Sequence, residues 1–156
     1  MKLYLLRHAN ADTRASTDDA RPLSEKGIEQ AKRVGRFCRE KAIAPEVILS
    51  SPLTRARQTA EHFLSEHPLG EPEIAAFLAS GMRPENALVE LKAYEKFESV
   101  LIVGHEPDFS VLVAHLIGLT DNANVAIRKA SLTLLEVPAL RAGAASLEFS
   151  LPCRLI

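Results

Sequence analysis

The side chains best suited to chemistry in this sequence are four basic ones: Arg7, His8, Arg55 and His105. Each stands at, or just beyond, the end of a short apolar run. An Arg-His pair or a lone histidine in such a place is usually structural, so neither would indicate a site by itself. Basic groups that converge at one place, however, repel each other unless an anion neutralises them. The set therefore favours a phosphate-binding site if the fold brings the four together.

Short apolar runs predict the strands that would position these side chains. The runs cover residues 3–6, 47–49 and 100–103, and each is too short to form a helix. Helices are expected after the N-caps Ser24 and Ser51, the latter with Pro52 as first helical residue, and at the prolines Pro84 and Pro107. The helix that begins at Pro84 is expected to extend to Tyr94.

The last third of the chain has a different pattern. Residues 132–137 and 147–151 predict two strands that pair antiparallel at a sheet edge, and residues 74–77 predict one further short strand. Strands and helices alternate before that, which predicts an α/β fold of three layers, α/β/α, with a mostly parallel sheet. We expect a single domain over residues 1–156. In such sheets the ligand site lies at the carboxyl ends of the strands, where the four basic residues are expected.

Composition excludes several classes of function. The chain has 156 residues, 47% hydrophobic and 25% charged, which is typical of one soluble globular domain. A net charge of -1 and the absence of tryptophan argue against nucleic-acid binding. No run approaches the roughly 20 apolar residues of a membrane span, and Arg7 ends the first apolar run too early for a signal peptide. Cys38 and Cys153 lack metal-ligand spacing, so we expect a reduced, cytoplasmic location.

Three motifs resemble those of the histidine phosphatase superfamily, which has the phosphoglycerate mutase-like fold. They are Leu6-Arg7-His8-Ala9, the segment from Ser50 to Ala60, and Gly104-His105-Glu106-Pro107. The motifs follow the order of the family and span nearly the whole chain. The short length, the segment Arg21-Pro22-Leu23-Ser24 and the Gly-His-Glu-Pro form are similar to the SixA-type phosphohistidine phosphatases.

This resemblance implies a role for each candidate residue. His8 would be the nucleophile that accepts the phosphoryl group, and His105 the second histidine of the pocket. Arg7 and Arg55 would bind the phosphate, with Arg21 as a further contact; no metal or other cofactor is implied. Such roles suit the residue types, because the rigid guanidinium fork stays charged and matches phosphoryl oxygens. His8 must attack as the neutral imidazole, with its other nitrogen held protonated by a backbone carbonyl.

The sequence departs from the family pattern at two places. Ala9 replaces a glycine, which matters only if that residue needs a positive φ. Residues 77–84 lack the carboxylate that many metabolite phosphatases of the family use there as general acid. An alkoxide leaving group needs that acid, whereas imidazole has a conjugate acid of pKa ~6.5 and departs more easily. Glu106 is the remaining candidate proton donor, and a helix-start carboxylate is its alternative reading.

These features predict a metal-free phosphatase that hydrolyses phosphohistidine, as on a protein phosphotransfer domain in signal transduction, through a phosphohistidine intermediate at His8. The alternatives are a phosphomonoesterase for a small phosphorylated molecule and a non-catalytic phosphate-binding module. The intact histidines and arginines argue against the non-catalytic module. We expect a phosphate or sulfate ion to bind in the site. The polar segment 10–22 is expected to cover part of it, and its carboxylates Asp18 and Asp19 are expected to be solvated.

Overall fold

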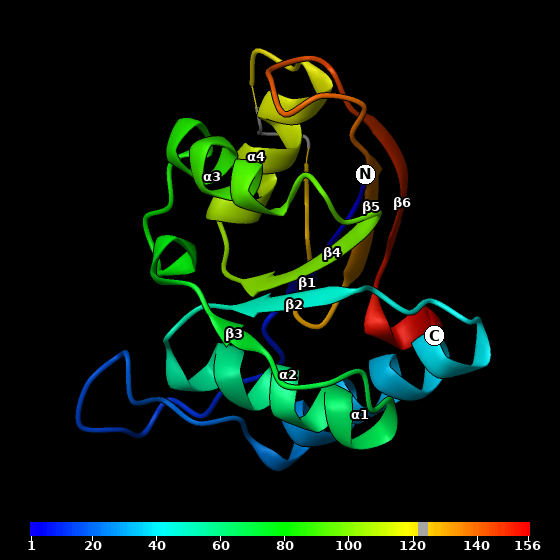
Figure 1. The fold of residues 1–156 in the computed structure, drawn as a ribbon. Coiled ribbons are helices and arrows are strands. Elements are labelled where there is room, and N and C mark those ends of the chain that lie inside the picture. Colours follow the sequence, from blue (N-terminus) through cyan, green and yellow to red (C-terminus); the bar gives the residue numbers. More distant parts are fainter. Residues whose placement is uncertain (122–124) are drawn as a thin grey trace.

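The computed structural model, which describes residues 1–121 and 125–156, is built around one six-stranded sheet (Figure 1). Its strands are β1 (Lys2–Arg7), β2 (Val47–Ser50), β3 (Glu73–Ile74), β4 (Ser99–Gly104), β5 (Leu132–Glu136) and β6 (Ser146–Leu151). The order across the sheet is β3-β2-β4-β1-β5-β6. The first four in that order are parallel, and β5 and β6 continue the sheet antiparallel. This confirms the predicted mostly parallel sheet with an antiparallel edge.

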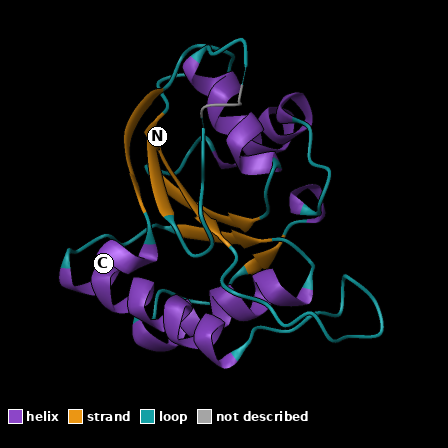
Figure 2. Ribbon diagram, turned by 180° about the vertical axis from the view of Figure 1, so that it is seen from behind, coloured by secondary structure: helices purple, strands orange, loops and turns teal. Residues whose placement is uncertain are grey.

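Helices cover both faces of the sheet, which confirms the three layers (Figure 2). The helices α1 (Glu25–Glu40) and α2 (Thr54–Glu66) lie on one face, and α3 (Pro84–Leu91) and α4 (Asp108–Ile117) lie on the other. Short 3-10 helices span Ala76–Leu78, Lys92–Tyr94 and Cys153–Leu155. In the described part of the chain no helix combines the length and apolar character needed to cross a bilayer.

Strand β1 lies within the sheet and is buried on both faces. Leu3 and Leu5 belong to the core under α3 and α4, whereas Tyr4 and Leu6 belong to the core under α1 and α2. The three leucines have no exposed surface, and burying each such side chain contributes about 1.5–3 kcal/mol. Because β1 is packed on both faces, its position is fixed, and so is the position of His8, the residue after the strand.

The predicted start of the first helix is confirmed, but that of the second is wrong. Ser24 caps α1, and its side chain accepts a hydrogen bond from the first turn of the helix. Instead of beginning at Pro52, α2 begins at Thr54 and has no side-chain cap. The Ser51 hydroxyl instead accepts a hydrogen bond from the N–H of Leu53, which lies just before α2, and its oxygen lies 2.7 Å from Nε2 of His105.

Two other elements are shorter than predicted. The strand expected at residues 74–77 ends at Ile74, because the neighbouring strand β2 ends at Ser50 and offers only two partners. The helix expected to reach Tyr94 ends at Leu91, and a 3-10 turn completes the segment. Neither difference displaces the carboxyl ends of β1, β2 and β4.

Candidate active site

The structure brings the four basic residues to one place. Arg7 ends β1 and His8 follows it, His105 follows β4, and Arg55 lies in the first turn of α2, after β2. These three strands are neighbours in the sheet, and all run in the same direction. The ring centroids of His8 and His105 are 5.2 Å apart. Both arginines lie close enough to lower the pKa of both histidines.

His8 is oriented with one ring nitrogen free. Its Nδ1 lies 2.8 Å from the carbonyl of Ala9, which only accepts, so Nδ1 carries the proton and Nε2 keeps its lone pair. Burial, more than the nearby charges of His105 and the arginines, lowers the pKa of His8 to about 3. The ring is therefore neutral and nucleophilic at physiological pH.

The alanine that replaces the family glycine is accommodated without strain. Ala9 is fully buried and is not among the described residues with positive φ. Its N–H donates to Oγ1 of Thr59 at 3.0 Å, and that hydroxyl donates to the carbonyl of Arg55 at 2.7 Å. These bonds tie the end of β1 to the first turns of α2.

His105 is anchored by one ring nitrogen. Its Nε2 contacts the Ser51 hydroxyl, which already accepts a hydrogen bond from the N–H of Leu53 at 3.3 Å. The hydroxyl can therefore donate its own proton to Nε2, which leaves the proton of the ring on Nδ1. Burial, with a smaller effect of Arg55, lowers the pKa of His105 to about 4. A neutral ring with a free Nδ1–H is suited to donate to a phosphate oxygen.

The two arginines are held differently. The Nη1 of Arg7 donates to the carbonyl of Ile127 at 2.8 Å. Arg55 donates from Nη1 to the carbonyl of Asp18 at 2.8 Å, and its Nη2 lies 3.1 Å from the Asp18 carboxylate. Arg55 is buried, so the direction of its guanidinium is fixed by these contacts.

Three buried side-chain atoms have no hydrogen-bond partner in the part of the chain that the structure describes: Arg7 Nε, His105 Nδ1 and Glu106 Oε1. Buried polar atoms are almost always paired, so each exception needs an explanation. All three belong to residues that the sequence singled out for the site. A bound phosphate would supply oxygens to the arginine and the histidine.

Glu106 has one engaged and one free carboxylate oxygen. Its Oε2 accepts from the Ser110 hydroxyl at 2.6 Å, within the first turn of α4. Burial raises the pKa of Glu106, although Ser110 and the nearby Arg7 oppose the shift. The Ser110 contact fits a helix-start carboxylate, whereas the raised pKa and the free oxygen fit a proton donor.

The segment between β1 and α1 contributes a carboxylate that sequence reasoning had discounted. Asp18 is exposed, as expected, but it also pairs with Arg55 and, at 3.0 Å, with Arg21. These two arginines lower the pKa of Asp18. Arg21 also donates to the carbonyl of Asp12 at 2.8 Å, so its contact with the site passes through Asp18.

The Asp18 carboxylate offsets part of the positive charge of Arg55. We therefore expect Asp18→Asn to tighten the binding of inorganic phosphate by about two- to fivefold, the range of one exposed ion pair. Inhibition constants for phosphate measure the effect, and the neighbouring Asp19→Asn is the matched control. Weaker binding in Asp18→Asn would instead show that the carboxylate positions Arg55 for phosphate.

The depressed pKa values of His8 and His105 predict how stability depends on pH. Folding favours their neutral forms, so below pH ~6.5 the unfolded chain binds more protons than the folded one. The free energy of unfolding should therefore fall as pH drops from about 6.5 toward 4, by up to about 1.4 kcal/mol per pH unit for each histidine. Urea unfolding at several pH values tests this, and His8→Ala should reduce the slope. An equal slope in that variant would contradict the assignment.

Several residues that support the site were not predicted. Ser51 and Thr59 lie within the second motif, and Thr59 is four residues after Arg55, so helical spacing was a usable signal. The turn before β5 had no such signal. There Ala130, with φ +53°, donates its N–H to the carbonyl of Arg7, while Ile127 binds the side chain of that arginine.

Among residues 1–121 and 125–156, no three histidine, cysteine, aspartate or glutamate side chains are grouped in a way that could hold a metal ion. The groups that converge on His8 are guanidinium donors and a second imidazole, a set suited to an oxyanion.

Comparisons with known proteins agree with this geometry. The model of the histidine phosphatase superfamily, branch 1, matches residues 3–79. An uncharacterized protein of Picosynechococcus is 39% identical over 69% of this chain and 68% of its own length. Phosphohistidine phosphatase SixA of Escherichia coli is 28% identical over 74% of each chain. The structure of the protein histidine phosphatase SixA complexed with tungstate superposes with a TM-score of 0.89, at 22% identity, over 99% of this chain and 98% of that one.

The chain belongs to the histidine phosphatase superfamily, branch 1, and has its phosphoglycerate mutase-like fold. It is a phosphatase-type member with a SixA-like structure. The relatives also include the adenosylcobalamin/α-ribazole phosphatase of Escherichia coli, 25% identical over 79% of this chain and 82% of that protein.

Proposed function

We propose that this protein hydrolyses phosphohistidine without a metal, through a covalent intermediate on His8. The observation that carries the proposal is the orientation of His8. Its Nδ1–H binds the carbonyl of Ala9, so Nε2 remains unprotonated, and His105 and both arginines are nearby. This is the protonation state that a phosphoryl acceptor needs. The substrate is a protein side chain or a small molecule that bears phosphohistidine.

In the first step, the Nε2 lone pair of His8 attacks phosphorus. The bond from phosphorus to the substrate nitrogen breaks, and its electron pair returns to that nitrogen. When the phosphorylated ring carries a proton on its other nitrogen, the substrate departs as neutral imidazole. Arg7, Arg55 and Nδ1–H of His105 would bind the equatorial oxygens, where the transferring group concentrates its negative charge.

In the second step, water attacks the phosphorus on His8. The phosphorus–nitrogen bond breaks, and its electron pair restores the neutral imidazole. The product is dihydrogen phosphate, which keeps both protons of the water until it reaches solvent. The carbonyl of Ala9 holds Nδ1–H through both steps, because the intermediate is a protonated ring at that nitrogen. His8 thus returns to its starting form.

The shortage of general acids in the site supports phosphohistidine, whose leaving group is imidazole, as the substrate. Residues 77–84 contain no carboxylate, and Glu106 already uses one oxygen for Ser110. An imidazole leaving group needs less acid assistance than an alkoxide. The similarity to SixA proteins in sequence and in structure supports the same choice.

A small-molecule phosphomonoesterase is the second candidate. The raised pKa of Glu106 and its free oxygen would suit it to protonate an alkoxide. The α-ribazole phosphatase among the relatives supports this alternative. A non-catalytic phosphate-binding module is less well supported, because such a module has no need of a free Nε2 on His8.

Turnover of two kinds of substrate tests the proposal. We expect kcat/KM for a phosphorylated histidine-containing phosphotransfer domain to exceed that for an alkyl phosphate by roughly 100-fold or more. The assay contains a chelator, because the proposed steps use no metal. A preference for the alkyl phosphate would favour the second candidate, and activity that appears only with a divalent ion would contradict the metal-free mechanism.

A further inference from the structure

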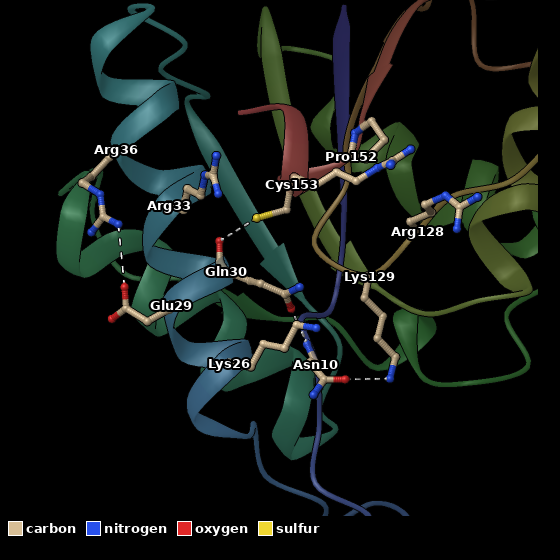
Figure 3. Close-up of a pocket in the computed structure, with 11 residues that line it drawn as sticks. Asn10, Lys26, Glu29, Gln30, Arg33, Arg36, Arg128, Lys129, Pro152 and Cys153 are labelled. Atoms are coloured by element: carbon tan, nitrogen blue, oxygen red, sulfur yellow. Dashed lines mark hydrogen bonds and ion pairs between the residues drawn. The ribbon is translucent and has the colours of Figure 1, made fainter.

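A groove of about 950 Å³ runs beside the active site (Figure 3). One wall is the exposed side of α1, and the other combines the turn before β5 with the 3-10 helix Cys153–Leu155. Along α1 the wall extends from Lys26 to Arg36, a distance of about 15 Å at 1.5 Å per residue. A single phosphate ion would fill only a small part of this space.

The groove is strongly basic although the chain as a whole has a net charge of -1. Its basic lining residues are Lys26, Arg33, Arg36, Arg128, Lys129 and Arg154, and Glu29 is its one acidic lining residue. Glu29 and Glu66 pair with Arg36. Within the described residues, no salt bridge engages the other five basic side chains. Four of those five are exposed. Arg33 also donates to the main-chain oxygen of Ile156, so the charges of Lys26, Arg128 and Arg154 are the most available to a partner.

Asn10 and Lys129 bring one part of the groove close to the active site. Asn10, two residues after His8, lines its end and donates its backbone N–H to Gln30 of α1 at 2.9 Å. Lys129 donates to the Asn10 side chain at 3.1 Å, and burial, with a smaller effect of Arg7, lowers the pKa of Lys129. Because Asn10 is only two residues after His8, a short spacer would join a phosphorylated group at His8 to a segment in the groove.

The lining favours an acidic polypeptide over other anions. The described residues that line the groove include no aromatic side chain on which a base could stack. The groove is therefore a poor binding site for a nucleic acid. A small phosphorylated metabolite would leave most of the basic side chains without a counter-charge. An extended chain of about six residues spans roughly 20 Å and would cover the length of the groove. Carboxylates along it would pair with guanidinium groups on both walls.

We propose that this groove is a docking site for an acidic segment of the protein that carries the phosphohistidine. The inference rests on the proposed function, because it assigns the substrate's flanking residues to a surface next to His8. The docked segment adds affinity and steers the phosphorylated side chain toward the site, and its contribution falls with rising salt.

Matched peptides test the docking site. Each carries one phosphohistidine, flanked on both sides by a short Gly-Ser spacer and then by about six glutamates or the same number of glutamines. Wild-type protein should hydrolyse the glutamate peptide with a kcat/KM about tenfold higher at low salt. The double variant Lys26→Glu with Arg154→Glu, which changes exposed residues on opposite walls, should lose this preference. Free phosphohistidine should be hydrolysed equally by both proteins.

A second double variant, Lys92→Glu with Arg141→Glu, makes the same charge change at exposed residues outside the groove and should keep the preference. Equal turnover of both peptides by the wild type, or a preference that survives in the groove variant, would overturn the docking site. Groove-dependent binding of a single-stranded oligonucleotide, without a glutamate preference, would also overturn it in favour of nucleic acid. Wild-type protein that hydrolyses neither peptide nor free phosphohistidine would instead show that the proposed function itself is wrong.

Discussion

His8→Ala is expected to lower the turnover of phosphohistidine by roughly 10⁴-fold or more, because it removes the atom that accepts the phosphoryl group. Neither Arg7 nor His105 can replace it. The guanidinium has no free lone pair, and Nε2 of His105 is engaged by Ser51. Single-turnover kinetics with a phosphorylated phosphotransfer domain measure the loss.

Two controls separate the loss of the nucleophile from a loss of the fold. His8→Ala should keep the circular dichroism spectrum of the wild type, because β1 is held by the core residues that precede His8. His62→Ala, on α2 and away from the converging groups, should keep near-normal turnover. If His8→Ala retained a rate within a few-fold of the wild type, the covalent mechanism would be wrong.

Glu106→Gln should distinguish the two candidate substrates. On phosphohistidine we expect little change, because imidazole departs without strong acid assistance. On an alkyl phosphomonoester we expect a loss of roughly 10²–10⁴-fold, the usual contribution of a general acid. Glutamine keeps an oxygen to accept from Ser110, so the start of α4 should be preserved. The ratio of kcat/KM values for the two substrates is the measurement.

The alternative interpretation, in which Glu106 only stabilises the start of α4, makes a different prediction. A carboxylate that only stabilises the start of α4 would cost about 0.3–1 kcal/mol of stability when neutralised, and both substrates would be affected equally. A large and equal loss on both would show that phosphohistidine also depends on the acid. That result would contradict the leaving-group argument for this substrate.

The convergence of the catalytic candidates was predictable because it depends on local patterns and one general property of parallel sheets. Apolar runs located β1 and β4, and the polar residues that follow parallel strands meet at one edge. Arg7, His8 and His105 were therefore placed from the sequence. The motif resemblance supplied their proposed roles, which composition and spacing do not contain.

The contacts that complete the site were less predictable because they join residues far apart in the chain. The Arg7 side chain binds Ile127 across 120 positions, and Asp18 reaches Arg55 across 37. The helix start at Ser51 was mispredicted for a related reason. A serine before a proline is a good local cap, but here its hydroxyl accepts from the N–H of Leu53 before the helix starts and also contacts His105, 54 positions away.

The basic groove is a further example of a feature that only the fold assembles. Lys26 and Arg33 are seven positions apart and lie on the exposed side of one helix. Arg154 comes from the far end of the chain, where a 3-10 helix packs beside α1. The net charge of the whole sequence conceals this local excess of positive charge.

The most direct test of the account is to identify the residue that becomes phosphorylated. Wild-type protein is mixed with a radiolabelled phosphohistidine substrate and quenched in base within a single turnover, since phosphohistidine is labile in acid. Peptide mapping then locates the label. The account predicts a transient label on His8 that forms and decays at rates able to support turnover. Label on another residue, or release of phosphate with no labelled protein at any time, would contradict it.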